Sequence, residues 1–158
     1  MKFRERAVLF VATGFFIGKV PFAPGTFGTL IGLPVCFLLS RLNSLQSVIC
    51  ILVFIPFAIG IASAAEKILK QKDPGQIVID EIAGLMITFA GLPFNLKTAL
   101  AGFIIFRVLD ILKPFPIHTL EKRVAGGSGV VLDDVLAGVY GNLILRLVIF
   151  MTDIVGFN

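Results

Sequence analysis

The chain has 158 residues and a formal net charge of +4 at pH 7; 57% of its residues are hydrophobic and 15% are charged. With a mean hydropathy of +0.99, it is too apolar for an ordinary soluble domain and indicates a small integral membrane protein with one domain, residues 1–158. No cluster of Lys and Arg with interleaved aromatic residues is present, which argues against a nucleic acid partner. Cys36 and Cys50 lie in apolar stretches without ligand-like spacing and are expected to be buried thiols.

The N-terminal segment has four charged residues among positions 2–6, followed by an apolar run from Ala7 to Gly18. This pattern imitates a secretory signal, but no small-residue cleavage site follows it, so we expect the segment to be retained. The run is too short for a helix that crosses a bilayer, which needs roughly 20 residues. An interfacial or re-entrant helix is therefore expected here.

The apolar segments that follow predict an all-α fold, a small polytopic bundle of short membrane-spanning helices. The expected spans are residues 27–40, 45–65, 82–96, 98–112 and 134–152. Several are shorter than a full crossing and require local thinning of the bilayer or shallow insertion. If the N-terminal helix lies at the cytoplasmic surface, most Lys and Arg residues fall on that starting side. Only Arg41, Lys97 and Arg146 fall elsewhere, as the positive-inside rule requires of a cytoplasmic starting side.

Adjacent carboxylates open two of these segments, Asp80 with Glu81 and Asp133 with Asp134, and Asp110 closes a third. Considered alone, the first pair could be explained by helix capping, with Asp80 as N-cap and Glu81 in the first turn. The predicted spans nevertheless place all five carboxylates on the cytoplasmic side. Because the spans follow from hydropathy and not from the acids, this convergence independently supports a single site.

Five carboxylates gathered at a membrane face would repel one another and lose solvation. Such groups are rare in membrane segments unless they are paired, bound to a metal or functional. Carboxylates without accompanying His or Cys are hard oxygen ligands, which favour Mg²⁺ or Ca²⁺ over zinc. Since Mg²⁺ commonly completes its shell with a substrate phosphate, the pattern indicates a phosphate ester as substrate.

Residues near the acids could contact phosphate. Arg107, Asp110 and Lys113 are spaced by three and share one helix face, although a plain ion pair of Arg107 with Asp110 explains that spacing equally well. Lys113, just before a proline stop, is a plausible phosphate contact. The glycine-bearing stretches 24–26 and 126–129 could cradle phosphate oxygens, but neither is a P-loop. His118, the only histidine, is better explained as a solvated surface residue than as a proton-transfer group.

Four motifs in order carry a family resemblance. They are Pro24-Gly25-Thr26-Phe27-Gly28-Thr29, then Ile77-Val78-Ile79-Asp80-Glu81 with Gly84, then Phe106-Arg107-Val108-Leu109-Asp110 with Lys113-Pro114-Phe115-Pro116, and finally Gly126-Gly127-Ser128-Gly129 with Asp133-Asp134 and Ala137-Gly138. This combination, from about residue 14 to 142, resembles the phosphatidylglycerophosphatase A family. The resemblance implies an all-α, Mg²⁺-dependent phosphatase of the bacterial inner membrane. Such an enzyme removes the terminal phosphate of phosphatidylglycerophosphate to give phosphatidylglycerol.

The site expected on this basis faces the cytoplasm and holds one or two Mg²⁺ ions. Its catalytic residues would be Asp80, Glu81, Asp110, Asp133 and Asp134. Its metal ligands would be Asp80, Glu81, Asp133 and Asp134, with Glu81 the least direct. Its phosphate-binding residues would be Thr26, Arg107, Lys113, Gly126 and Gly127. Adjacent residues at a helix start point about 100° apart. One member of the Asp80–Glu81 pair should therefore bind the metal directly, while the other acts through water or an indirect contact. Direct attack by water and a phospho-Asp or phospho-Thr26 intermediate both stay open.

Two other protein classes fit parts of the pattern. A small divalent-cation carrier or channel could use the same acids, but it predicts acids distributed through the bilayer depth and leaves the glycine turns unexplained. A CDP-alcohol phosphotransferase also uses Asp and Mg²⁺ on phospholipid precursors. The long Asp-Gly and Ala-Arg signature of that family is absent here.

Overall fold

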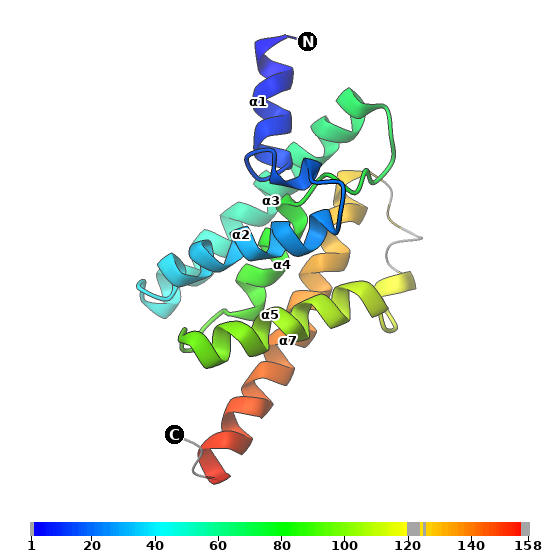
Figure 1. Cartoon of the computed structure of the whole chain (residues 1–158). Coiled ribbons are helices and arrows are strands. Elements are labelled where there is room, and N and C mark those ends of the chain that lie inside the picture. The colour runs from blue at the N-terminus through cyan, green and yellow to red at the C-terminus, as the bar shows by residue number, and fades with distance from the viewer. Residues whose placement is uncertain (1, 120–123, 125, 156–158) are drawn as a thin grey trace.

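The computed structural model describes residues 2–119, 124 and 126–155, and all of its regular elements are helical (Figure 1). This confirms the all-α prediction. In chain order the elements are α1 (Phe3–Ala12), η1 (Ile17–Lys19), α2 (Pro24–Leu39), α3 (Ser44–Leu69), α4 (Ile79–Thr88), α5 (Leu96–Leu112) and α7 (Gly127–Val155).

The short helix α4 forms the centre of the bundle, with α2, α3, α5 and α7 packed around it (Figure 1). Every residue from Ile79 to Met86 is buried. The expected span 82–96 is therefore wrong, because the helix lies earlier in the chain and is not a membrane span. The helix has 10 residues, about 15 Å at 1.5 Å per residue, and it is enclosed by protein rather than long enough to cross a bilayer.

Both ends of α4 are fixed by hydrogen bonds from other elements. Before its start, the Val78 N–H donates to the Ala12 carbonyl at the end of α1, 2.9 Å away. Val78 is the N-cap, so the expectation that Asp80 caps this helix is wrong. At the other end, the Asn142 side-chain amide of α7 donates to the carbonyls of Ile87, Thr88 and Ala90 at 3.0–3.2 Å. These bonds satisfy carbonyls at the end of the helix, and the Ala90 carbonyl also accepts a bond from Arg146 Nη2 at 2.9 Å.

Glycines allow α4 and α7 to cross at close range. A Cβ on Gly138 would collide with the backbone of Gly84, and a Cβ on Gly84 would collide with the Asp134 carbonyl and the Phe106 ring. The Thr88 hydroxyl, one turn further along α4, donates to the Gly84 carbonyl at 3.1 Å. Gly84 follows Asp80 by four residues and Gly138 follows Asp134 by four. The crossing therefore holds the two acid pairs on adjacent turns of neighbouring helices.

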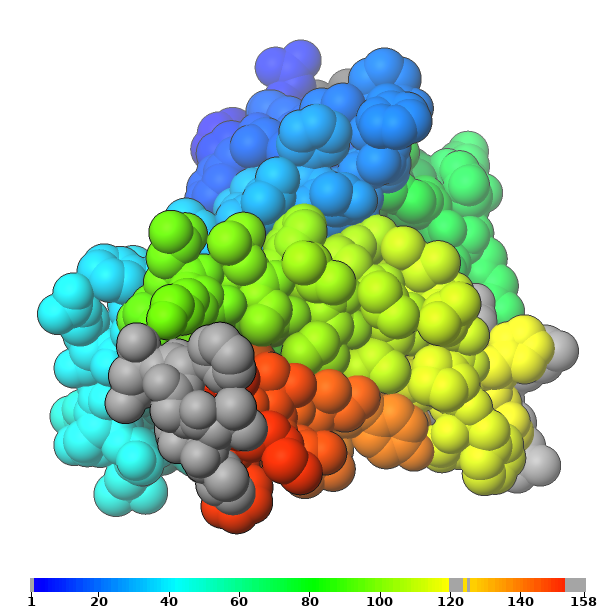
Figure 2. All heavy atoms as spheres, turned by 60° about the horizontal axis from the view of Figure 1, so that its bottom comes forward, coloured from blue at the N-terminus to red at the C-terminus, as the bar shows by residue number. Residues whose placement is uncertain are grey.

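The outer surface of the bundle is apolar. Candidate membrane spans are Ser44–Leu69 and Gly127–Thr152, with mean hydropathies of 2.6 and 1.8, and only 22% of the most apolar stretch of each is buried. A core helix of a soluble protein would be mostly buried. Large exposed hydrophobic side chains also lie along α2 and α5, and α5 crosses the face shown in Figure 2 between the N-terminal segment and α7. The fold thus fits a small helical membrane protein.

The structure differs from the sequence expectations at several single elements. The first helix covers Phe3–Ala12 rather than the apolar run 7–18, and turns and η1 follow it. Cys36 is buried as expected, whereas Cys50 is exposed on α3. The last helix begins at Gly127 instead of near residue 134, so Asp133 and Asp134 lie in its second turn. Five helix ends still lie toward one end of the molecule (Figure 1): the start of α2, the end of α3, the start of α4, the end of α5 and the start of α7.

Candidate active site

An ion-pair network links α4 to α5 at this end. The Arg107 guanidinium donates to Glu81 Oε1 at 3.3 Å and also pairs with Asp110, one turn along the same helix. The start of α2 packs directly against this network. A Cβ on Gly25 or on Gly28 would collide with a carboxylate oxygen of Glu81. The first glycine motif therefore leaves room for the Glu81 side chain.

A second ion pair links α5 to α7. Lys113 ends α5 with a positive φ of 42°, and its ammonium donates to Asp133 Oδ2 at 2.6 Å. Asp133 Oδ1 accepts the backbone N–H of Asp134 at 3.1 Å. Arg107 and Lys113, which we expected to bind phosphate, are thus both engaged with carboxylates in this structure.

Asp80 and Asp134 are the least compensated acids. Their exposed fractions are 7% and 4%, and the described residues offer neither of them a cationic partner. From the described part of the chain, the Asp80 carboxylate accepts the Glu81 N–H alone, at 3.0 Å. Burial raises the pKa of Asp80 well above its usual range; that N–H lowers the pKa, and the neighbouring charges of Asp133, Asp73 and Asp110 raise it further.

Glu81 makes other contacts than its neighbour Asp80. Burial raises the pKa of Glu81 well above its usual range and the charge of Asp80 adds to this, while Arg107 opposes both. Its Oε1 is held by Arg107, but its Oε2 is buried and accepts no hydrogen bond from the described residues. A buried carboxylate oxygen without a donor has its desolvation uncompensated, so this atom is suited to an added cation.

The donor chemistry of the cluster fits a hard divalent cation. Asp80, Glu81, Asp110, Asp133 and Asp134 supply carboxylate oxygens only, against the two cations Arg107 and Lys113. This is the ligand type that Mg²⁺ prefers. Within the described residues, no three acidic, His or Cys side chains converge as a ready-made metal site. The acids instead lie as pairs on α4 and α7, so a cation would have to draw their oxygens together.

A cavity of about 190 Å³ opens beside Asp133, and its lining includes residues that sequence reasoning did not select. Lys72 and Asp73 come from the loop between α3 and α4, and His118 from the segment after α5. Asp73 appeared in the sequence only as the start of an Asp-Pro-Gly turn, and nothing in that local pattern placed it beside a cluster seven residues later. The lining residues are Lys72, Asp73, His118, Val124, Gly126, Gly129, Val130 and Asp133.

Of the glycines and the threonine expected to bind phosphate, only some lie at the cavity in the described structure. Gly126 lines the cavity beside Asp133, whereas Gly127 faces α3, where a Cβ would collide with Ser63. Gly127 therefore serves helix packing. The first turn of α2 reaches the cluster through its glycines, and no hydrogen bond of the Thr26 hydroxyl to a described carboxylate is formed.

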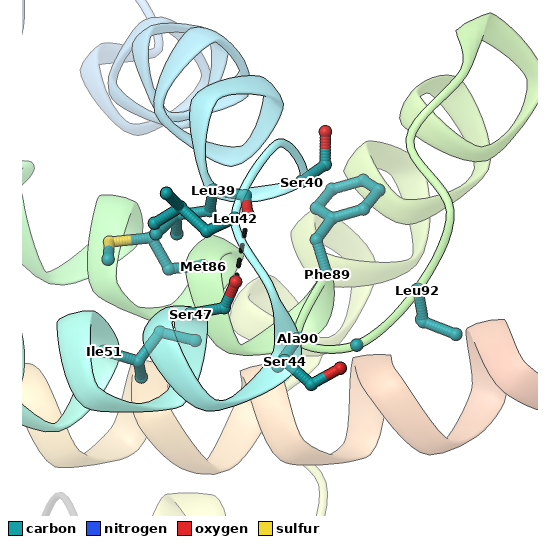
Figure 3. Close-up of a pocket in the computed structure, with 11 residues that line it drawn as sticks. Leu39, Ser40, Leu42, Ser44, Ser47, Ile51, Met86, Phe89, Ala90 and Leu92 are labelled. Atoms are coloured by element: carbon teal, nitrogen blue, oxygen red, sulfur yellow. Dashed lines mark hydrogen bonds between the residues drawn. The ribbon is translucent and has the colours of Figure 1, made fainter.

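A second cavity of about 190 Å³ lies where α2 leads into α3, at the far end of α4 (Figure 3). Its walls are apolar side chains such as Met86 and Phe89 together with serine hydroxyls, and Ser47 donates to the Leu39 carbonyl at 2.9 Å. No side chain lining it is ionisable at neutral pH. This cavity lacks the groups for acid–base or metal chemistry, so the acidic end of the bundle is the candidate active site.

One sequence signal for the α4–α7 crossing was overlooked. Residues 80–84 read Asp-Glu-Ile-Ala-Gly and residues 134–138 read Asp-Val-Leu-Ala-Gly. Both stretches place an acid one turn before an alanine and a glycine. The two alanines, Ala83 and Ala137, are buried, with 1% and 0% exposed. Two copies of one such pattern indicate two helices that meet at their glycines with their acids side by side.

Comparison with known proteins places the chain in a family. Residues 10–149 match the family model described as Phosphatidylglycerophosphatase A. The chain is 36% identical over 139 residues to phosphatidylglycerophosphatase A of Escherichia coli (strain K12), which covers 87% of this chain and 81% of the relative. It is 34% identical to phosphatidylglycerophosphatase A of Haemophilus influenzae, over 85% and 84% of the two chains.

A relative with another printed name is equally similar. The putative phosphatidylinositol-3-phosphatase of Bacteroides thetaiotaomicron is 36% identical over 145 residues, 87% of this chain and 90% of the relative. No solved structure matches the chain. Because the family model spans most of the sequence, the chain belongs to the phosphatidylglycerophosphatase A family.

Proposed function

We propose that this protein hydrolyses the terminal phosphomonoester of phosphatidylglycerophosphate, releasing phosphatidylglycerol and phosphate. The observation that carries the proposal is the placement of Asp80 and Glu81 beside Asp133 and Asp134 by the glycine crossing of α4 and α7. Two of the similar relatives bear the name of this activity. A cation carrier would distribute its acids along a path through the bundle, whereas here they lie at one end.

We further propose that the reaction depends on Mg²⁺, held by Asp80, Asp133 and Asp134 with Glu81 contributing less directly. Mg²⁺ would supply the positive charge that lets a phosphate dianion approach these carboxylates and would stabilise the charge that develops on the phosphoryl oxygens. The support is the all-carboxylate donor set and the burial of Asp80 and Asp134 without a cationic partner among the described residues. Glu81 also has a buried Oε2 without a donor, but Arg107 holds its other oxygen.

The two cations near the acids act as organisers in this proposal. Arg107 holds Glu81 and Asp110 together and offsets part of their repulsion. Lys113 fixes one oxygen of Asp133 and leaves the other with the Asp134 N–H. Each cation limits the rotation of a carboxylate and keeps its free lone pairs directed into the site.

We place the site at the cytoplasmic face of the bacterial inner membrane, in a multi-pass protein. The apolar outer surface of α2, α3, α5 and α7 supports the membrane assignment. Charged residues support the orientation, because Arg41 after α2, Lys97 at the start of α5 and Arg146, which bonds to Ala90 beyond the end of α4, lie away from the acids. Arg107 and Lys113 pair with the acids, and Lys67, Lys70 and Lys72 lie at the end of α3 and in the loop that follows it. Labelling of a cysteine introduced at Lys70 from one side of sealed vesicles tests this orientation.

Phosphate release by the purified protein in detergent tests the function. With phosphatidylglycerophosphate we expect release that stops on addition of EDTA and returns with Mg²⁺. Phosphatidylinositol 3-phosphate, presented in the same micelles, should be hydrolysed at least about tenfold more slowly. Equal release with EDTA would refute the metal dependence. Faster release from the inositol lipid would assign the other head group, and no release from either lipid would refute the phosphatase proposal.

A further inference from the structure

The cavity beside Asp133 raises the question of which cation meets an incoming phosphate. Arg107 is shared between Glu81 and Asp110, and Lys113 is paired with Asp133 at 2.6 Å. Both cations of the family motif are thus committed to carboxylates. Their charges are already offset by these carboxylates, so each attracts an incoming phosphate dianion less strongly than a cation without a carboxylate partner would.

Lys72 is the lysine that lines the cavity. Its ammonium makes no hydrogen bond or ion pair with any residue in the described ranges, in contrast to Lys113. The side chain is exposed, so it can meet a ligand without first being desolvated. It belongs to none of the four family motifs.

The loop that carries Lys72 is anchored on both sides. The Asp73 N–H donates to Glu66 Oε1 of α3 at 2.8 Å, and Pro74 is fully buried. The Pro74 carbonyl in turn accepts the Ile77 N–H at 2.8 Å, two residues before α4 begins. These contacts fix the loop between α3 and the helix that bears Asp80, and so hold Lys72 at the cavity.

We infer that the cavity beside Asp133 receives the phosphomonoester group and that Lys72 binds it there. This inference rests on the proposed phosphatase function and adds a substrate-binding residue to it. Gly126 and Gly129 also line this cavity. An aqueous opening of about 190 Å³ between Lys72 and Asp133 has room for a phosphate group and its water, since one water takes about 30 Å³ of liquid volume.

Substitution of Lys72 should weaken phosphate binding without abolishing turnover. For Lys72→Gln we expect the KM for phosphatidylglycerophosphate and the Ki for inorganic phosphate to rise roughly five- to tenfold, the size of one exposed charge-assisted contact, with kcat within about twofold of wild type. Lys72→Arg should retain most of the affinity. Lys70→Gln removes the same charge from the same loop but does not touch the cavity, and it should leave both constants unchanged.

Two results would overturn this inference: an unchanged Ki in Lys72→Gln, or an equal rise in Lys70→Gln, which would show a general effect of loop charge. Should the wild type fail to hydrolyse the lipid, the proposed function fails separately. In that case, phosphorus NMR line broadening of inorganic phosphate, in the presence of Mg²⁺, tests Lys72 without turnover. Broadening by wild type that is lost in Lys72→Gln supports the inference, and broadening that is equal in both refutes it.

Discussion

Asp80 shows the conflict between stability and function at the scale of a single residue. Its carboxylate is buried and uncompensated, and burial raises its pKa. For an acid whose pKa is raised in the folded state, ionisation destabilises the fold. That cost is absent below the unfolded pKa, about 3.9. It grows as the pH rises from there and is complete above the folded pKa.

The Asp80→Asn variant should therefore be more stable than wild type in the absence of divalent cations. At neutral pH we expect a thermal midpoint roughly 3 °C higher by circular dichroism, with the difference shrinking toward pH 4. Added Mg²⁺ should stabilise wild type more than the variant. Glu5→Gln, in α1 and away from the cluster, should change the midpoint little at any pH. A variant that melts below wild type at neutral pH would contradict this account of Asp80.

Sequence reasoning brought the acidic residues together but missed most of the contacts that they make in the structure. An ion pair of Arg107 with Asp110 was one of the two explanations that their spacing allowed, and the structure shows that pair. The pair of Lys113 with Asp133 was not predicted, because it joins two helices across a connection whose path the sequence does not define. Lys72 and Asp73 were missed for the same reason, since a loop residue carries no periodicity that shows where it points.

At the scale of elements, the contact of α4 with α7 decides the geometry of the site. Gly138→Ala would place a methyl group against the Gly84 carbonyl, within the backbone of the partner helix, which cannot move as a side chain can. We expect a loss of roughly 1–3 kcal/mol in unfolding free energy from such overpacking, together with lower activity, because the acid pairs would separate.

The matched control is Gly60→Ala. An added Cβ at Gly60 of α3 would meet nothing within 4 Å, so this variant should be neutral or more stable by up to about 1 kcal/mol. Denaturant unfolding in detergent and phosphate release compare the two variants directly. If Gly138→Ala keeps full stability and activity, then close contact of these helices does not position the acids.

The elements themselves were predicted unevenly, for physical reasons. Hydropathy located α2, α3 and α5 to within a few residues, because each exposes an apolar face along its length. It failed for α4, since a helix enclosed by protein is as apolar as one that faces lipid. It also placed the start of α7 too late. The glycines 126–129 suggested a loop, whereas Gly127 begins the helix and packs tightly on α3.

At the scale of the whole molecule, helices with apolar outer faces surround a short buried helix that presents acids at one end. A membrane protein gains little hydrophobic energy by burying α4 among other helices, so its close packing depends on glycine contacts and on the polar bonds of Asn142 to its last carbonyls. The same crossing that packs the core brings Asp80 and Glu81 next to Asp133 and Asp134. The fold and the proposed chemistry therefore share one structural cause.

The central claim is that the acids of α4 and α7 work as one active site. It is tested most directly by the kcat of Asp80→Asn, Asp134→Asn and the double variant on phosphatidylglycerophosphate at saturating Mg²⁺. Each single substitution should lower kcat about 100-fold or more, and the double variant should be at most a few fold slower than the worse single one, because residues that act as a unit are not additive. Near wild-type turnover in either single variant, or losses that multiply in the double variant, would contradict the claim.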